Sequence, residues 1–231
     1  MKAIIKNELR KYFYSPLGYI VIGLILVVFS LYMLSGIVMD KIFDMGISLY
    51  YTLELALSII VALASMGLFA EERKTGTEKI LLSAPISTFK MILSKFLSVG
   101  IIVLIAGILM TVEFFIFKAF GPYSIVEGMA QILGFMLVLM AGVSFGMFVS
   151  SVSENSIIAG ALTIIPMIIF NIVSTQLMVE NALMSIIYLP RLYINFARGI
   201  ISIADILVLL LFIAFFFILT MLVFKRRKLV K

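Results

Sequence analysis

The chain has 231 residues, of which 64% are hydrophobic and only 13% are charged, and its mean hydropathy is +1.25. A soluble domain of this size could not bury so much apolar surface, so the composition predicts an integral membrane protein. The absence of cysteine and histidine excludes a disulfide framework, thiolate or histidine metal sites, and a histidine general base. The net charge of +6 lies beside apolar segments, where it favours anionic membrane lipid over nucleic acid.

Residues 1–15 are too polar to span a membrane but have the pattern of an amphipathic helix. Basic and apolar side chains fall on different sides, which suits a helix lying in the membrane interface. The basic residues are Lys2, Lys6, Arg10 and Lys11, and the apolar ones are Ile4, Ile5, Leu9, Tyr12 and Phe13.

Six later segments are long and apolar enough to cross a bilayer, whose core of about 30 Å needs roughly 20 helical residues. They are residues 17–39, 49–69, 96–117, 129–149, 157–176 and 203–224. The sequence therefore predicts an all-α integral membrane protein with six transmembrane helices, forming a single domain over residues 1–231.

An even number of spans puts both termini on the same side of the membrane. The N-terminal segment, the loop after the second span and the C-terminus together carry 14 of the 18 Lys and Arg residues. Because cytoplasmic loops are enriched in these residues, we expect both termini and the loop at residues 70–95 to be cytoplasmic.

This loop is the main polar interruption of the chain, with eight charged residues between Glu71 and Lys95. Gly76 would break a first short helix, and Thr77 could cap a second one with Glu78 in its first turn. The second helix would have an apolar side and a proline limit, formed by Ile80, Leu81, Leu82 and Pro85. Such a helix could lie on the membrane or dock into a partner protein, and the residues alone leave both open.

Residues 181–202 are apolar but interrupted by Pro190 and by polar side chains such as Arg191, Asn195 and Arg198. The segment is too short and too broken for a span. It predicts external interfacial or re-entrant helices before the last span.

Small residues recur on one face of the fourth predicted span, at Gly142, Gly146 and Ser150. This spacing lets two helix backbones approach closely. Packing inside one subunit is favoured over a moving or dimerising interface, because such patterns are common in membrane helices.

Three carboxylates lie inside predicted spans. Glu54 shares a helical face with Ser58 and Ala62, so that face is expected to point to protein or water as a substrate or ion contact, or to lie near headgroups. Glu113 and Asp205 lie closer to the outer edge, where contact with headgroups is the simpler interpretation.

No catalytic motif is present in the sequence. Gly18 and Gly23 have the spacing of a phosphate-binding loop, but Leu24 follows where that motif needs a lysine. The chain is therefore not expected to bind ATP itself or to be an enzyme.

The loop nevertheless resembles a known family. The residues from Glu71 to Ser87, followed by Lys95, are similar to the first cytoplasmic loop of ABC-2 type transporter permeases, with its acidic pair, Gly-Thr, Glu, two leucines and Pro. The basic N-terminal helix, six spans and broken segment before the last span agree with this family. Residues 193–201 are similar to the branch that includes gliding-motility and copper-maturation permeases.

The resemblance implies a permease subunit, an exporter of the prokaryotic inner membrane, driven by a separate ABC ATPase that binds ATP and Mg²⁺. A second permease subunit, identical or paralogous, would complete the translocation path. Residues 1–15 would be the elbow helix of the family, and residues 76–85 its coupling helix. The ATPase-coupling surface would comprise Glu71, Glu72, Gly76, Thr77, Glu78, Leu81, Leu82 and Pro85.

Two other classes remain compatible with the residues. One is a secondary transporter or channel that needs no ATPase, for which Glu54 is the candidate ion-coupling group. The other is a membrane anchor of a multiprotein complex, which would use the polar loop as its docking segment.

Overall fold

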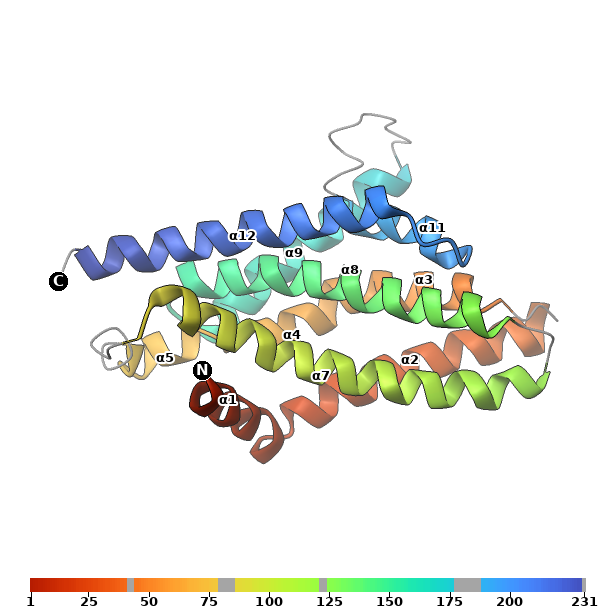
Figure 1. Ribbon diagram of the computed structural model, residues 1–231, viewed down its shortest axis with the longest axis horizontal. Coiled ribbons are helices and arrows are strands. Elements are labelled where there is room, and N and C mark those ends of the chain that lie inside the picture. The colour runs from red at the N-terminus through yellow and green to blue at the C-terminus, as the bar shows by residue number, and fades with distance from the viewer. Residues whose placement is uncertain (41–43, 79–85, 121–123, 177–187, 230–231) are drawn as a thin grey trace.

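The computed structural model describes residues 1–40, 44–78, 86–120, 124–176 and 188–229, and within these ranges the chain is helical without strands (Figure 1). The predicted all-α class is confirmed. The α-helices are α1 (Lys2–Tyr14), α2 (Leu17–Ser35), α3 (Met45–Leu55), α4 (Val61–Ser65), α5 (Ala70–Lys74), α7 (Thr88–Phe117), α8 (Ile125–Val152), α9 (Ser156–Gln176), α11 (Ile194–Ala197) and α12 (Ile203–Leu229). Two π-helical turns, η1 (Gly36–Asp40) and η2 (Ala56–Ile60), and two 3₁₀ turns, η3 (Lys118–Phe120) and η4 (Leu189–Tyr193), connect them.

Five helical segments of the described chain are long and apolar enough to cross a membrane. They match the predicted first, second, third, fourth and sixth spans. The predicted fifth span corresponds to α9, in which the described apolar stretch is the shorter Ser156–Ile169. The five segments are Leu17–Val38, Met45–Lys74, Thr88–Phe117, Ile125–Val152 and Ile203–Arg227.

The second of these segments is not a uniform α-helix. The π turn η2 separates α3 from α4, directly after Glu54 and Leu55. A π turn adds a residue to the helical turn, so it changes the register between the residues before and after it. Hydropathy alone predicts one continuous helix here, because every residue of η2 is apolar except Ser58.

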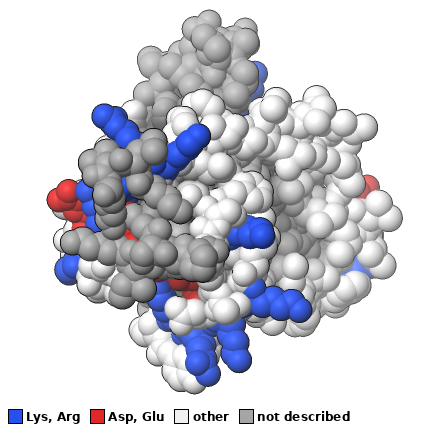
Figure 2. Space-filling model, turned by 60° about the vertical axis from the view of Figure 1, so that its left-hand side comes forward, with Lys and Arg blue, Asp and Glu red and all other residues white. Residues whose placement is uncertain are grey.

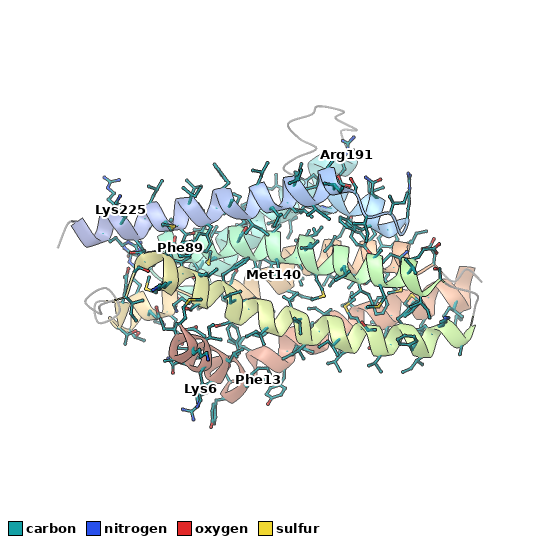
Figure 3. The ribbon with its side chains drawn as sticks, viewed as in Figure 1. Lys6, Phe13, Phe89, Met140, Arg191 and Lys225 are labelled. Carbon is teal, nitrogen blue, oxygen red and sulfur yellow. The ribbon has the colours of Figure 1, made fainter. Side chains whose placement is uncertain are left out.

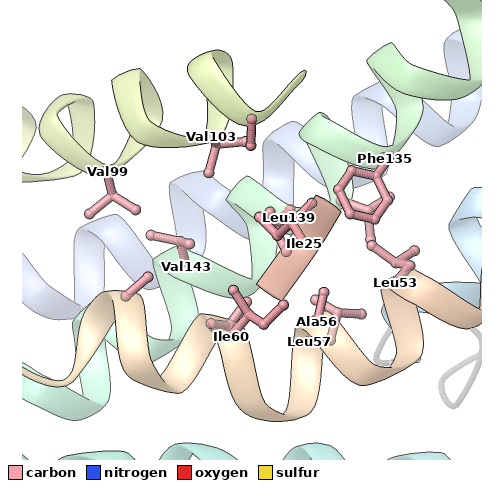
Figure 4. Packing of buried hydrophobic residues seen from close by; sticks show 14 of the residues in the cluster. Ile25, Leu53, Ala56, Leu57, Ile60, Val99, Val103, Phe135, Leu139 and Val143 are labelled. Atoms are coloured by element: carbon pink, nitrogen blue, oxygen red, sulfur yellow. The ribbon is translucent and has the colours of Figure 1, made fainter. Parts of the chain in front are cut away.

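The centre of the bundle is α8, which packs against α3, α4, α7, α9 and α12. In Figure 4, Phe135, Leu139 and Val143 of α8 lie among apolar side chains of the neighbouring helices. In a membrane this contact is favoured by close packing rather than by exclusion of water, because lipid is as apolar as the core. The neighbours labelled in Figure 4 are Ile25, Leu53, Ala56, Leu57, Ile60, Val99 and Val103.

The small residues of α8 permit this close approach inside one subunit. A Cβ atom at Gly142 would lie 2.6 Å from Leu57 Cδ2, and one at Gly146 would lie 2.0 Å from Ser65 Oγ. The predicted small-residue face therefore packs against η2 and α4. A larger residue at Gly146 would push α4 away from α8, whereas one at Gly142 would first displace the end of the Leu57 side chain.

The two ends of the bundle contain different elements (Figure 1). At one end lie α1, α5, the start of α7 and the C-terminal end of α12, joined by ion pairs described below. At the other end, η4 and α11 pack against α3 and α8.

The segment expected at residues 181–202 is described from Tyr188 onward, while 181–187 lie outside the described residues. Its two short helical turns, η4 and α11, are seated on the bundle. Tyr193 and Phe196 are buried, and a Cβ at Gly134 of α8 would lie 2.3 Å from Phe196 Cγ. Gln131 Nε2 also donates a hydrogen bond of 2.7 Å to the Ala197 carbonyl, which fixes α11 on α8.

Candidate functional site

The most unusual polar feature is a buried lysine where α1, α5 and α7 meet. Lys95 of α7 has a side chain that is 0% exposed. Its ammonium donates to Glu8 Oε1 at 3.0 Å, to Glu72 Oε1 at 2.7 Å and to the Leu68 carbonyl at 2.6 Å. An ammonium has three N–H groups, so all of its donors are satisfied.

Lys11 of α1 completes a charge cluster, defined here as Glu8, Lys11, Glu72 and Lys95. Its ammonium lies 3.1 Å from the same Glu8 oxygen and 3.2 Å from the same Glu72 oxygen. Each carboxylate therefore bridges two ammonium groups, and the cluster has no net formal charge. Lys95 forms its inner side and the 41% exposed Lys11 its outer side.

Burial by itself lowers the pKa of Lys11, but the neighbouring carboxylates of Glu8 and Glu72 outweigh it and raise the pKa above the ordinary lysine value. For a buried cluster, good geometry offsets desolvation, whereas removal of one partner leaves an uncompensated charge and costs about 3–5 kcal/mol. Loss of one member of the charge cluster is therefore expected to disturb the packing of α1, α5 and α7 more than loss of an exposed ion pair would.

Ser150 of α8 holds the turn between α4 and α5. Its hydroxyl oxygen accepts hydrogen bonds from the backbone N–H groups of Phe69 at 3.1 Å and Ala70 at 3.2 Å, and the hydroxyl donates to the Met66 carbonyl at 2.9 Å. These backbone groups would otherwise lack partners where the second span ends. Besides allowing close packing, Ser150 thus fixes the direction in which α5 leaves the membrane segment.

Two arginines attach the loop to other parts of the same end. Arg73 donates to the Val152 carbonyl at 2.8 Å and pairs with Glu154 at 3.0 Å, while Arg227 of α12 pairs with Glu78 at 2.8 Å. Arg227 also donates to the Ser151 carbonyl at 2.6 Å. The described part of the loop is therefore held from α1, α7, α8 and α12.

The predicted coupling residues separate into an outer and an inner group. Glu71, Gly76 and Thr77 are exposed, whereas Glu72 is buried and Glu78 pairs with Arg227. Glu72 therefore does not present its carboxylate to a partner, as a surface role would require. It anchors α5 to Lys95.

Gly76 has a φ of +74°, and an added Cβ would meet no atom within 4 Å. The glycine is thus needed for its backbone conformation and not for space. Thr77 is predicted to cap the following helix, whose residues 79–85 lie outside the described part of the chain. Its hydroxyl is hydrogen-bonded to the Thr75 hydroxyl at 3.0 Å and donates to the Glu72 carbonyl of α5 at 3.3 Å. The predicted coupling residues Leu81, Leu82 and Pro85 lie outside the described residues.

The intramembrane polar residues are not gathered into one site. Tyr188 donates to Glu54 Oε1 at 2.9 Å, and Asn195 donates to Asp205 Oδ2 at 2.7 Å. The Ser58 hydroxyl is used within its own helix, where it donates to the Glu54 carbonyl at 2.6 Å.

Glu113 of α7 has a buried Oε2 that lacks a hydrogen-bond partner among the described residues. The contacts of Glu54 and Asp205 join different pairs of elements. They do not assemble a polar path through the described part of the bundle.

The sequence interpretation missed Glu8 and the inward roles of Lys11, Lys95 and Arg227. One signal was available for Glu8, because it is the single carboxylate in a basic amphipathic helix. A second signal was available for Lys95, which lies directly before the apolar part of the third span. Neither signal predicts which residues pair, because Glu8 and Lys95 are 87 positions apart and no local pattern connects them.

Comparison with curated proteins gives no match. A family model described as ABC-2 family transporter protein matches residues 2–229, which include every helix of the bundle. The match spans nearly the whole chain and agrees with the resemblance of the Glu71–Ser87 loop. This polytopic helical bundle therefore belongs to the ABC-2 transporter family.

Proposed function

We propose that the chain is the permease subunit of an ATP-driven exporter, and that its ATPase partner binds at the end formed by α1, α5 and the C-terminal end of α12. The observation that carries this proposal is the charge cluster around Lys95, which connects the loop after the second span to two other helices. ATP and Mg²⁺ would be bound by the partner chain. A second permease subunit, identical or paralogous, would complete the path.

In the proposed topology this end of the bundle lies in the cytoplasm of a prokaryotic cell. The chain crosses the inner membrane six times. The three segments that carry 14 of the 18 basic residues include α1, α5 and the end of α12. The chain also passes from Glu154, paired with Arg73 at this end, to Tyr188, bonded to Glu54 near the other end. Because α9 lies in that interval, we assign it as the sixth crossing.

Transmission through the loop follows from what is exposed and what is fixed. A partner would contact the exposed Glu71, Gly76 and Thr77, and a force on them would move α5. Because Glu72 pairs with Lys95 and Lys11, the displacement of α5 would be passed to α7 and α1. The Ser150 hydroxyl would act as the pivot, since it binds the backbone on both sides of the turn.

The test is co-purification of tagged protein from native membranes in mild detergent, with mass spectrometry and ATP hydrolysis measured on the eluate. We expect a P-loop ATPase in the eluate. Glu71→Arg should reduce its recovery about tenfold, because reversed charge at a protein contact costs affinity. Gly76→Pro should abolish the stimulation of the partner's ATP hydrolysis by the permease, since proline cannot adopt the positive φ of this position.

The matched control is Glu127→Arg, the same change at an exposed carboxylate near Gly199 at the opposite end. It should leave recovery and hydrolysis unchanged. An eluate without ATPase, under conditions that keep complexes intact, would contradict the proposal and favour ATPase-independent transport. Glu54 would then be the next residue to change.

A further inference from the structure

The outer side of α1 borders an open hollow that the charge cluster does not use. The hollow has a volume of about 640 Å³ and lies between α1 and the start of α2. Its lining residues are Lys2, Ile5, Lys6, Leu9, Arg10, Phe13, Tyr14 and Tyr19.

The charges around this hollow are all positive. Lys2, Lys6 and Arg10 are exposed and form no ion pair with the described residues, and no carboxylate lines the space. This contrasts with Lys11 on the same helix, which is neutralised by Glu8 and Glu72. Figure 2 shows Lys and Arg side chains projecting along the lower edge of this end, where α1 lies in Figure 1.

The floor of the hollow is apolar. Ile5, Leu9 and Phe13 recur at helical spacing along α1, and Phe13 packs edge-on against Tyr19 of α2 with ring centroids 5.6 Å apart. Figure 3 shows Lys6 and Phe13 together at the lower edge of the molecule. Tyr19 and Ile20 continue the exposed apolar surface onto the first span.

We propose that this hollow binds an anionic phospholipid, with its phosphate among Lys2, Lys6 and Arg10 and its acyl chain along Ile5, Leu9 and Phe13. Three neighbouring cations without a carboxylate partner attract an anion, and the apolar floor continues onto a membrane-spanning helix. An acidic protein surface would satisfy the cations but not the floor, whereas a phospholipid satisfies both. The proposal depends on membrane insertion of α2 and not on the proposed ATPase coupling.

The test uses fluorescence, because the chain contains no tryptophan. In Phe13→Trp the single tryptophan, excited selectively over the tyrosines, lines the hollow. The protein is placed in phosphatidylcholine vesicles, and quenching is compared for acyl-brominated phosphatidylglycerol and acyl-brominated phosphatidylcholine. Because each basic residue near a membrane surface favours anionic lipid by about fivefold, we expect a preference of more than about tenfold for phosphatidylglycerol.

The deciding variant adds Lys6→Gln and Arg10→Gln, which are exposed changes that leave the charge cluster intact. It should lower the preference for phosphatidylglycerol by more than about tenfold, and Lys2 alone of the three cations would still contribute. The matched control adds Lys225→Gln and Arg226→Gln, which remove two exposed charges from α12 and should leave the preference within about twofold.

Three results would overturn the proposal. Equal loss in the two variants would show a diffuse surface charge instead of a site. Absence of quenching by both lipids would show that protein, such as a second copy, covers the hollow. Loss of the preference for phosphatidylglycerol in millimolar inorganic phosphate would show that the cations bind a soluble anion instead of a lipid.

Discussion

The two ends of the bundle are held together by different kinds of interaction. At the end with α1 and α5, fixed charges meet in the interior, and Lys95 has two carboxylate partners there. The end with α11 is called neutral here because no ion pair is described in it, although Asn195 and Tyr188 donate hydrogen bonds to the carboxylates of Asp205 and Glu54. Its surfaces interlock, with Phe196 against Gly134 and the Tyr193 hydroxyl donating to the Gln131 carbonyl at 3.2 Å. The charged end depends on complete pairing, whereas the neutral end depends on shape.

The largest expected effect is at the charged end. Lys95→Met leaves Glu8 and Glu72 buried without their inner cation, so stability should fall by about 3–5 kcal/mol. Thermal unfolding in detergent, read by size-exclusion of the soluble fraction, would measure the loss.

Neutralising the partners should reverse most of that loss. The triple variant Lys95→Met, Glu8→Gln, Glu72→Gln removes the stranded charges, and it should recover at least half of the lost stability because charge and not volume was the cause. A triple variant no more stable than Lys95→Met alone would show that Lys95 acts by packing, which would remove the contrast between the ends.

A smaller effect is expected at the neutral end. In Gly134→Ala the new methyl group would meet Phe196 Cβ and Cγ at 2.4 and 2.3 Å, so α11 must shift, at a cost of about 1–3 kcal/mol. Gly23→Ala is the matched control, because nothing lies within 4 Å of its Cβ position. Thermal unfolding should separate the two alanine variants, and equal melting temperatures would show that shape does not hold α11.

The smallest effect concerns Lys11 and pH. Its pKa is raised above the ordinary value of 10.5, so the folded protein holds this proton more tightly than the unfolded chain does. The stabilisation from Lys11 is therefore complete below pH 10.5 and is lost as pH rises through the folded value. Because the side chain is 41% exposed, solvent screening limits the contribution to less than about 1 kcal/mol.

Melting temperatures of the wild type and Lys11→Gln, compared between about pH 9 and pH 12, would measure this contribution. The wild type should be the more stable protein at the lower pH, and the difference should narrow above pH 10.5. A difference that stays constant over the range would assign the effect of Lys11 to packing of its aliphatic chain.

Segments with a strong local signal were predictable from the sequence. Hydropathy located five of the spans, and the amphipathic pattern of residues 1–15 matches α1. The small-residue spacing of α8 also indicated a close helix contact, which Gly142 and Gly146 make with Leu57 and Ser65. These features follow from composition and period within a single helix.

Features that depend on two distant segments were not predictable. The π turn η2 has the same apolar composition as a regular helix, so nothing local marks it. Glu72 was assigned to the surface because it lies in a polar loop, but Lys95 and Lys11 draw its carboxylate inward. The hydroxyl of Ser150 likewise has a role that only its contact with residues 80 positions away reveals.

The residues of the charge cluster are also synthesised in a defined order. Glu8, Lys11 and Glu72 all precede Lys95 in the chain, and so does Leu68, whose carbonyl accepts the third hydrogen bond of the Lys95 ammonium. When the ribosome adds Lys95, every group that neutralises it has already been synthesised. Lys95, the one fully buried cation among the described ion pairs, can therefore find all of its partners before the second half of the protein is synthesised.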